Sequence, residues 1–239
     1  MTREPIYRRW RVTGMALLCA VGVLAGCATG PQSDPRDPIE PFNRGVSRFN
    51  DAVDVAVLKP VATAYAEVTP DPVRTAVGNF FGNLRDIWSF LNATAQGRAE
   101  DAAVTFLRVG VNTAFGFGGL LDIASDMRLY RVSADFGQTL GVWGMPAGPY
   151  LVLPIWGPST LRDTVGMGVE ASGDLVMGVG DVATRNTLYT LRAVETRAGL
   201  LRAGAVLDEA ALDKYSFTRE VFLQRRQSVI DSQRNRDAE

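Results

Sequence analysis

The sequence contains no histidine in its 239 residues. This absence excludes the Ser-His-Asp and Cys-His nucleophile systems, in which an imidazole accepts the proton of the attacking group. It also excludes histidine-ligated zinc and a histidine general base. Most common hydrolase chemistry is therefore absent before any motif is considered.

Cysteine is almost as scarce, because only Cys19 and Cys27 are present. Cys19 lies in a predicted N-terminal leader, and Cys27 is the first residue after that leader. A mature chain that begins at a lipidated Cys27 has no thiol left for a disulfide, a metal site or a redox couple. We therefore expect its stability to come from packing alone.

An excess of charge of one sign is also lacking. Lys and Arg together number 25 against 26 Asp and Glu, so the formal net charge is −1. No basic excess is available to neutralise phosphates, which argues against nucleic-acid binding. Low net charge with 46% apolar residues also argues against a disordered chain. Lysine itself is rare, since Lys59 and Lys214 are its two occurrences.

Motifs for catalysis and cofactor binding are missing. There is no Walker A loop, G-x-S-x-G elbow or C-x-x-C pair. Residues 178–183 fit the loosest dinucleotide pattern, but no strand–helix organisation follows, and chance explains the match better. Asp122 and Asp126 lie one helical turn apart, and helix capping or solvation explains them better than acid–base chemistry. We expect no enzyme activity, no metal and no cofactor.

Residues 1–26 are predicted to be a lipoprotein signal peptide. The first residues are positively charged, and an apolar segment of thirteen residues follows, shorter than the about 20 needed to span a bilayer. The segment ends in Leu24-Ala25-Gly26-Cys27, which resembles a bacterial lipobox that leaves Cys27 as an acylated N-terminus. Ala28, and not aspartate, follows it, which resembles a sorting signal for the outer membrane. An ordinary secretory leader with an incidental Cys27 is the alternative.

The rest of the chain predicts a mainly α fold in a single domain. Residues 28–37 lack periodicity and are rich in Gly, Pro and Ser, so we expect a tether. Helical patterns follow at about 42–57, 71–97, 98–112, 135–143, 158–170, 182–203 and 216–232. Pro60 is expected to interrupt the first pattern, and Asp71 to cap the second. Residues 150–154 are the one convincing extended segment, and Pro154 keeps it out of a central strand.

Phe42 and Asn43 are candidate residues for fixing the register of the first helix. Phe42 begins the apolar stripe Phe42, Val46, Phe49, Val53 and Val57, which is typical of one face of an amphipathic helix. We expect this stripe to be buried. Deleting Phe42 and Asn43 together rotates it by about 200°, which misaligns every position that it buries.

Residues 102–121 are almost continuously apolar and have the length of a membrane span. Arg108 in the middle costs about 2.5–3.5 kcal/mol on insertion scales, and glycines at 116, 118 and 119 break the helix. A helix buried in the protein or lying in a membrane surface explains this segment better.

Two segments, 115–121 and 143–157, combine bulky apolar residues with glycine. Ordinary turns with core aromatics are one interpretation, and a pliable apolar surface that handles lipid is the other. In the second segment the loop from Gly144 to Tyr150 is a candidate gate of a lipid path, because aromatic residues that prefer membrane interfaces flank it. Glycines give its backbone freedom and prolines restrict that freedom to particular hinges. The candidate gate residues are Trp143, Gly144, Pro146, Gly148, Pro149 and Tyr150.

Several motifs in order resemble the MlaA/VacJ family of outer-membrane lipoproteins. They are Asp37-Pro38-Ile39-Glu40-Pro41-Phe42-Asn43-Arg44, Asn79-Phe80-Phe81-Gly82-Asn83-Leu84, Asn112-Thr113, Gly118-Gly119-Leu120-Leu121-Asp122, Asp135-Phe136-Gly137-Gln138-Thr139-Leu140-Gly141, Gly148-Pro149-Tyr150-Leu151-Val152-Leu153-Pro154, Gly157-Pro158-Ser159-Thr160-Leu161-Arg162-Asp163, Glu195-Thr196-Arg197-Ala198 and Phe222-Leu223-Gln224-Arg225-Arg226. The resemblance covers about residues 35–228.

The resemblance implies a ring of amphipathic helices in the inner leaflet of the outer membrane, on its periplasmic side, with an amphipathic channel through the ring. Mislocalised phospholipid would leave the outer leaflet through this channel and reach a soluble periplasmic carrier protein for retrograde transport. In well-studied relatives a trimeric porin is a further partner. The expected organisation is a signal peptide (1–26), a lipidated tether (27–37), a helical domain (38–232) and a polar tail (233–239).

A structural lipoprotein that bridges the outer membrane to the cell wall or to an assembly machine is the competing hypothesis. A lipid-cleaving enzyme conflicts with the missing histidine and serine elbow. The chain also departs from the family pattern at two places. It has Met145-Pro146-Ala147 where relatives have more glycine, and Asp213-Lys214-Tyr215 where relatives often have Asp-Pro-Tyr.

Overall fold

The structure, a computed structural model, describes residues 34–236. Its elements in chain order are α2 (Glu40–Val53), η1 (Asp54–Leu58), α3 (Lys59–Val68), α4 (Asp71–Ala95), α5 (Ala99–Ala114), α6 (Ile123–Asp126), α7 (Phe136–Val142), β1 (Tyr150–Leu153), β2 (Gly157–Thr160), α8 (Leu161–Ser172), α9 (Val182–Gly199), α10 (Leu201–Ala210) and α11 (Lys214–Arg236). This part of the chain is mostly helical, as the sequence predicts. The expected signal peptide (1–26) and Cys27, the expected start of the tether, lie outside the described residues.

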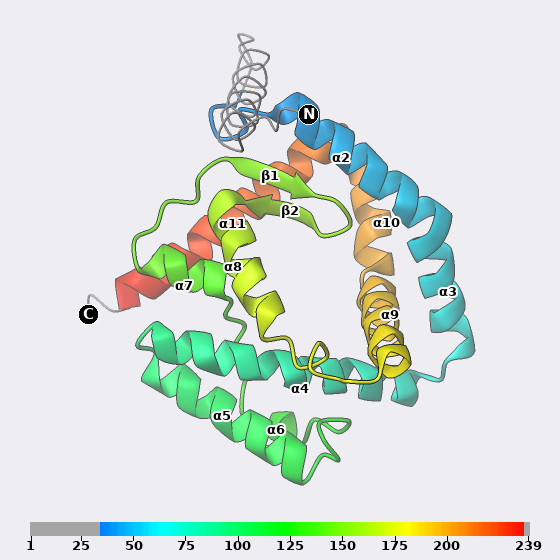
Figure 1. Cartoon of the computed structure of the whole chain (residues 1–239), viewed down its shortest axis with the longest axis vertical. Coiled ribbons are helices and arrows are strands. Elements are labelled where there is room, and N and C mark those ends of the chain that lie inside the picture. Colours follow the sequence, from blue (N-terminus) through cyan, green and yellow to red (C-terminus); the bar gives the residue numbers. More distant parts are fainter. Residues whose placement is uncertain (1–33, 237–239) are drawn as a thin grey trace, which may run out of the picture.

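The helices follow one another around a ring (Figure 1). The blue-to-cyan run from α2 through α3 forms one side, α4 crosses below it, and α11 lies on the opposite side. α9 packs along α3 and contacts α4, while α5 packs along α4 on the outside of the ring. No helix in residues 34–236 is both long enough and apolar enough to cross a membrane.

The first side of the ring is one continuous helical run, which the sequence did not predict. Pro60 does not interrupt the helix, because η1 is a single π-helical turn between α2 and α3 in which the Lys59 N–H donates to the Asp54 carbonyl. Proline lacks an N–H and is tolerated in the first turn after such a change of hydrogen-bond register. Pro60 is therefore an early residue of α3.

The segment after residue 150 also differs from its predicted form. β1 pairs antiparallel with β2, with Tyr150 opposite Thr160 and Leu153 opposite Gly157. Residues 158–160, expected at the start of a helix, thus belong to the strand β2. The helix α8 starts after them because the Thr160 side chain accepts the N–H of Asp163. Pro154 lies just beyond β1, outside the paired strands, as expected for proline.

Other helices begin or end a few residues away from their predicted bounds. α4 begins at Asp71 itself, with Pro70 at the N-cap. The expected helix over 182–203 is divided at Leu200 into α9 and α10. α11 runs through Arg236, so it extends into the polar tail that was expected from residue 233, and Gln233 is buried.

The buried part of the described chain, between packed elements, is unusually polar. The fully buried side chains of greatest volume include Arg108, Asn43, Asn92 and Asn112, whereas Tyr150 is the large apolar one among them. A small apolar cluster does exist around Tyr150, Val152 and Tyr215, with Val46, Phe222 and Leu223 packed against it. Hydrogen bonds and ion pairs between elements therefore hold much of this fold together.

Candidate functional site

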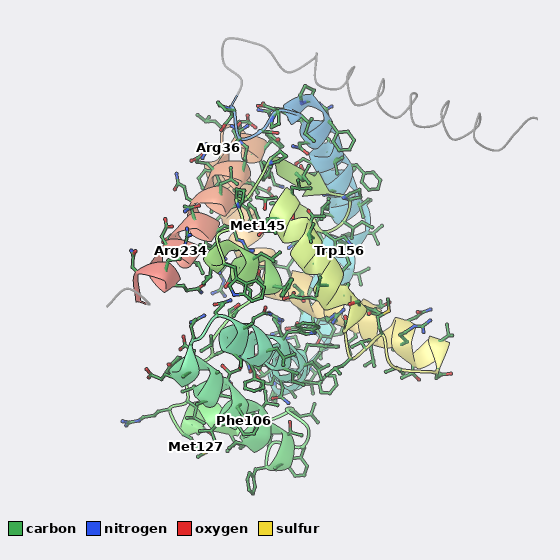
Figure 2. The ribbon with its side chains drawn as sticks, turned by 60° about the vertical axis from the view of Figure 1, so that its left-hand side comes forward. Arg36, Phe106, Met127, Met145, Trp156 and Arg234 are labelled. Atoms are coloured by element: carbon green, nitrogen blue, oxygen red, sulfur yellow. The ribbon has the colours of Figure 1, made fainter. Side chains whose placement is uncertain are left out.

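The surface of the ring carries many large apolar side chains. Figure 2 shows Phe106 and Met127 at the end of the molecule formed by α5 and α6. Met145 and Trp156 are labelled nearer the middle of the molecule. The most exposed examples are Leu212, Val68, Phe117, Phe115, Trp156 and Ile155. Monomeric soluble proteins rarely expose large contiguous apolar patches, and such patches are typical of contact with lipid or another protein.

The apolar stripe of the first helix belongs to this surface. Phe42 is 54% exposed, Phe49 and Val57 are about equally exposed, and none of the three is in the core. The expectation that Phe42 heads a buried stripe is therefore wrong. The physical reason is that the buried side of α2 is centred on Asn43, about 100° around the helix from Phe42. Phe42 and Phe49 therefore face outward, while Val46 of the same stripe packs against the apolar cluster.

Asn43, next to Phe42, is fully buried on that polar face. Its amide nitrogen donates to Asp37 Oδ1 at 2.8 Å and to the Tyr150 carbonyl at 3.0 Å. Its carbonyl oxygen accepts the N–H of Val152 at 2.9 Å. The side chain thus bonds to β1 as a neighbouring strand would, and it fixes α2 against the hairpin.

Asp37 joins the same network from the chain just before α2. Its buried carboxylate accepts bonds from Asn43, the Tyr215 hydroxyl and, at 2.9 Å, the Arg219 guanidinium. Burial, followed by this bond to Asp37, raises the pKa of Tyr215. Residues 34–37, expected to belong to the tether, are instead packed against α11, because Arg36 also pairs with Glu220 at 2.6 Å.

Arg108 is the centre of a second buried network, between α4, α5 and α6. Its guanidinium bonds to both oxygens of Asp122 at 2.8 and 3.0 Å, and lies 3.6 Å from Asp86. Burial raises the pKa of Asp86. Asp122 also caps α6 by accepting the N–H of Ser125. This confirms the capping interpretation of Asp122, while Asp126 is exposed. The apolar run over 102–121 is thus a helix anchored by its arginine, followed by a loop.

The candidate gate loop is tied to its neighbours by backbone hydrogen bonds. The N–H of Met145 donates to the Leu140 carbonyl, and the N–H of Arg162 donates to the Ala147 carbonyl. Gly144 and Gly148 both have positive φ, +98° and +70°, a conformation that favours glycine. Opening the loop therefore requires several backbone bonds to break.

The aromatic residues that flank this loop differ in environment. Trp143 is exposed, and its indole N–H donates to the Ala95 carbonyl at 3.0 Å. Tyr150 is 1% exposed, and burial raises its pKa to about 12. The expectation that Tyr150 sits at a wet interface is wrong, because it belongs to the apolar cluster with Tyr215. Pro146 and Pro149 lie in the loop between them.

A cavity of about 280 Å³ lies where α2 and η1 meet the hairpin, α10 and the start of α11. Part of its lining is apolar, from Val53, Leu58, Val152, Ile155 and Leu207. The charged side chains that line it are Asp51, Asp54, Arg197 and Lys214. The sequence pattern did not single out this site, because its residues come from three distant segments, 47–58, 150–158 and 197–218.

The charges of this cavity are paired. Arg197 Nε and Nη2 bond to the two oxygens of Asp54 at 2.5 and 2.8 Å, and this bond lowers the pKa of Asp54. Lys214 Nζ lies 3.1 Å from Asp51 and 2.9 Å from Asp208. Among the residues described, no group of Asp, Glu or Cys is arranged to hold a metal ion.

A family model described as MlaA lipoprotein matches residues 35–229. The chain belongs to the MlaA lipoprotein family. It is 35% identical over 228 residues to the "Intermembrane phospholipid transport system lipoprotein MlaA" of Escherichia coli strain K12, covering 90% of this chain and 88% of that one. The protein of the same name from Haemophilus influenzae is also 35% identical, over 90% of this chain and 89% of its own.

A solved structure supports the same assignment. It comes from work on the "Structural basis for maintenance of bacterial outer membrane lipid asymmetry", and the two chains superpose with a TM-score of 0.71 at 33% identity. The match covers 81% of this chain and 98% of that chain. The MlaA motifs seen in the sequence supply the polar anchors of this ring, including Asp37, Asn43, Asp122 and Asp163.

Proposed function

We propose that this protein is an outer-membrane lipoprotein that removes mislocalised phospholipids from the outer leaflet and passes them to a periplasmic carrier protein. This retrograde transport would maintain the lipid asymmetry of the outer membrane. The observation that carries the proposal is the inverted distribution of polarity, with polar anchors inside and large apolar side chains outside. The names of the relatives, which refer to intermembrane phospholipid transport and lipid asymmetry, point the same way.

The physical chemistry of transport suits these features. Moving a phospholipid changes no covalent bond, so no catalytic residue is needed. An apolar exterior favours transfer of the ring from water into the acyl-chain region of a membrane, because each CH₂ removed from water contributes about 0.8 kcal/mol. Buried polar groups are tolerated in such a membrane environment, away from water, because they are hydrogen-bonded to one another.

The location follows from the same proposal. An acylated Cys27 anchors the chain, and the ring lies in the inner leaflet on the periplasmic side. A trimeric porin is a proposed neighbour of the ring. The Gly144–Tyr150 loop is proposed to gate the lipid path, and its backbone bonds to Leu140 and Arg162 are then the contacts that opening breaks.

The test of transport is the phospholipid content of the outer leaflet in cells that lack the protein. We expect outer-leaflet phospholipid to rise, and the wild-type chain to restore it to normal. Unchanged outer-leaflet phospholipid, together with detachment of the outer membrane from the cell wall, would instead establish the structural lipoprotein as the correct hypothesis.

The test of the anchor is mass spectrometry of the mature N-terminus. We expect an acylated residue 27, and we expect Cys27→Ser to leave the chain uncleaved or without an anchor. An unmodified mature N-terminus would exclude the lipobox interpretation while leaving the transport proposal open.

A further inference from the structure

The two lysines of the chain meet at one aspartate beside the cavity. Lys214 Nζ lies 2.9 Å from Asp208, and Lys59 Nζ lies 3.8 Å from the other oxygen of the same carboxylate. Lys214 also reaches Asp51 at 3.1 Å. In a chain that otherwise uses arginine for its positive charge, both compact ammonium groups are placed together.

The charges around the cavity balance. Two acids and two bases line it, and Asp208 and Lys59 just beyond the lining add one of each. The net charge of the cluster is therefore zero, with positive and negative groups only a few ångströms apart. Such an arrangement complements a ligand that itself carries one charge of each sign.

We propose that this cavity binds the zwitterionic headgroup of a phospholipid, in which a phosphate is linked to a primary amine. The phosphate would bind Lys214, with Arg197 beside it, and the ammonium group would bind Asp51 and Asp208. The inference rests on the proposed function, because it names the class of phospholipid that the protein accepts.

The size and lining of the cavity fit a headgroup. Its volume of about 280 Å³ holds roughly nine waters at about 30 Å³ each, enough for a phosphate and an ethanolamine but not for two acyl chains. The apolar part of the lining, including Val53 and Leu207, would contact the glycerol and the first methylenes. The remaining acyl length would have to lie outside this cavity.

The lysine ion pairs are suited to exchange. Side chains of Lys214, Asp51 and Asp208 are each close to half exposed, and ion pairs at such positions contribute little to stability. A zwitterion replaces both halves of a pair, since its phosphate takes the lysine and its ammonium takes the aspartate. An anionic headgroup takes the lysine and leaves the aspartate without a partner, which disfavours it.

The experiment uses the purified full-length lipoprotein and vesicles of equal amounts of phosphatidylethanolamine and phosphatidylglycerol. The phospholipid that copurifies with the protein after incubation is quantified by headgroup. Wild type is expected to hold phosphatidylethanolamine in excess. The double variant Asp51→Asn with Asp208→Asn removes two negative charges, and it is expected to shift the ratio about tenfold toward phosphatidylglycerol.

A matched control comes from an ion pair outside the cavity. Arg192 lies on α9, the helix that also carries Arg197, and it pairs with Asp174 at 2.7 Å. The control variant Asp174→Asn, which also removes a paired carboxylate, is expected to leave the headgroup ratio unchanged. Lys214→Gln is expected to lower the total amount of bound phosphatidylethanolamine several-fold.

The outcomes separate the two proposals. Bound phospholipid with no headgroup preference, or with a preference that the double variant does not change, overturns the headgroup site and leaves the transport function standing. No bound phospholipid of either kind, from a folded wild-type protein, overturns both. A preference that shifts in the double variant and stays in Asp174→Asn supports the site.

Discussion

At the scale of single residues, two neighbours in the sequence have opposite roles. Phe42 is half exposed on the outer surface, whereas Asn43 is fully buried and bonded to Asp37, Tyr150 and Val152. An unpaired buried polar group costs about 1–3 kcal/mol, so the polar neighbour is the more sensitive one.

We therefore predict that Asn43→Ala lowers the free energy of unfolding by about 2–4 kcal/mol, because it leaves several buried groups of Asp37, Tyr150 and Val152 short of a partner. Phe42→Ala is the matched variant, and we expect it to cost clearly less than the roughly 3–5 kcal/mol typical of a buried phenylalanine. Urea unfolding in detergent micelles measures both. A larger loss for Phe42→Ala than for Asn43→Ala would contradict the structure.

Ionisation of Asp122 makes the free energy of unfolding depend on pH. Burial alone would raise its pKa, but hydrogen bonds from Ser125, Asn112 and Arg108 outweigh burial and lower the pKa from 3.8 to about 2. Because the pKa is lower in the folded state, Asp122 stabilises the fold at pH values above its unfolded pKa. This contribution is lost as the pH falls from about 4 to about 2. Because solvent screens part of the interaction, its size is about 1–2 kcal/mol.

We predict that Asp122→Asn destabilises the protein by about 3–5 kcal/mol at pH 7, because the buried Arg108 loses its closest charge partner. The difference from wild type should shrink by about 1–2 kcal/mol between pH 4 and pH 2. Denaturant unfolding at a series of pH values is the measurement, with the exposed Asp126→Asn as control. A difference between wild type and Asp122→Asn that stays constant down to pH 2 would show that the ion pair does not control acid stability.

At the scale of elements, the loop between α7 and β1 allows its proposed gating to be separated from its folding. Gly148→Pro is unsuitable as a test, because proline cannot adopt the φ of +70° found there. Gly144, at φ +98°, is a better site, since a methyl group added to its Cα would lie 3.8 Å from the nearest atom, on the Arg234 side chain. Gly97 has φ +75° and open space around it, and it lies in a different loop.

We predict that Gly144→Ala and Gly97→Ala each destabilise the protein by about 1–2 kcal/mol through backbone strain alone. If the α7–β1 loop is a gate, only Gly144→Ala should lower phospholipid transport at equal protein abundance. Outer-leaflet phospholipid in complemented cells is the readout. Equal transport in the two variants would make this loop a static connection.

At the scale of the whole molecule, the inverted distribution of polarity predicts affinity for lipid without the anchor. The outward stripe of Phe42, Phe49 and Val57 lies along α2 and η1, and aromatic side chains of α5 and the following loop add to it. Apolar area buried in the headgroup and acyl boundary drives such binding.

We predict that the chain from residue 28 onward, with no acyl group, still floats with phosphatidylethanolamine–phosphatidylglycerol vesicles. Changing Phe42, Phe49 and Val57 together to Ser should reduce the bound fraction at least several-fold while the circular dichroism spectrum stays helical. Serine at Val46, Val53 and Tyr150, which are less exposed, should unfold the protein instead. Unchanged flotation of the outer triple variant would show that this stripe does not contact lipid.

Local sequence patterns determined much of the fold and the class of protein. The period of 3.6 residues identified most helices, the breaker residues located the loop at 144–149, and the missing histidine excluded most hydrolase chemistry. Capping or solvation was the interpretation of Asp122, and the structure shows a cap, which depends on a residue only three positions away.

The tertiary structure alone decided which side of each helix faces inward. The spacing of apolar residues shows that a helix has two faces, but not which face packs against the other elements. Phe42 was therefore wrongly assigned to the core, and the bond from Asn43 to β1 could not be predicted. The full set of cavity charges was equally hidden. Asp208 and Lys214 are close in the sequence, but Asp51 meets Lys214 only when the ring closes. Contacts between residues about 150 positions apart leave no periodic signal, and the chain must fold before they exist.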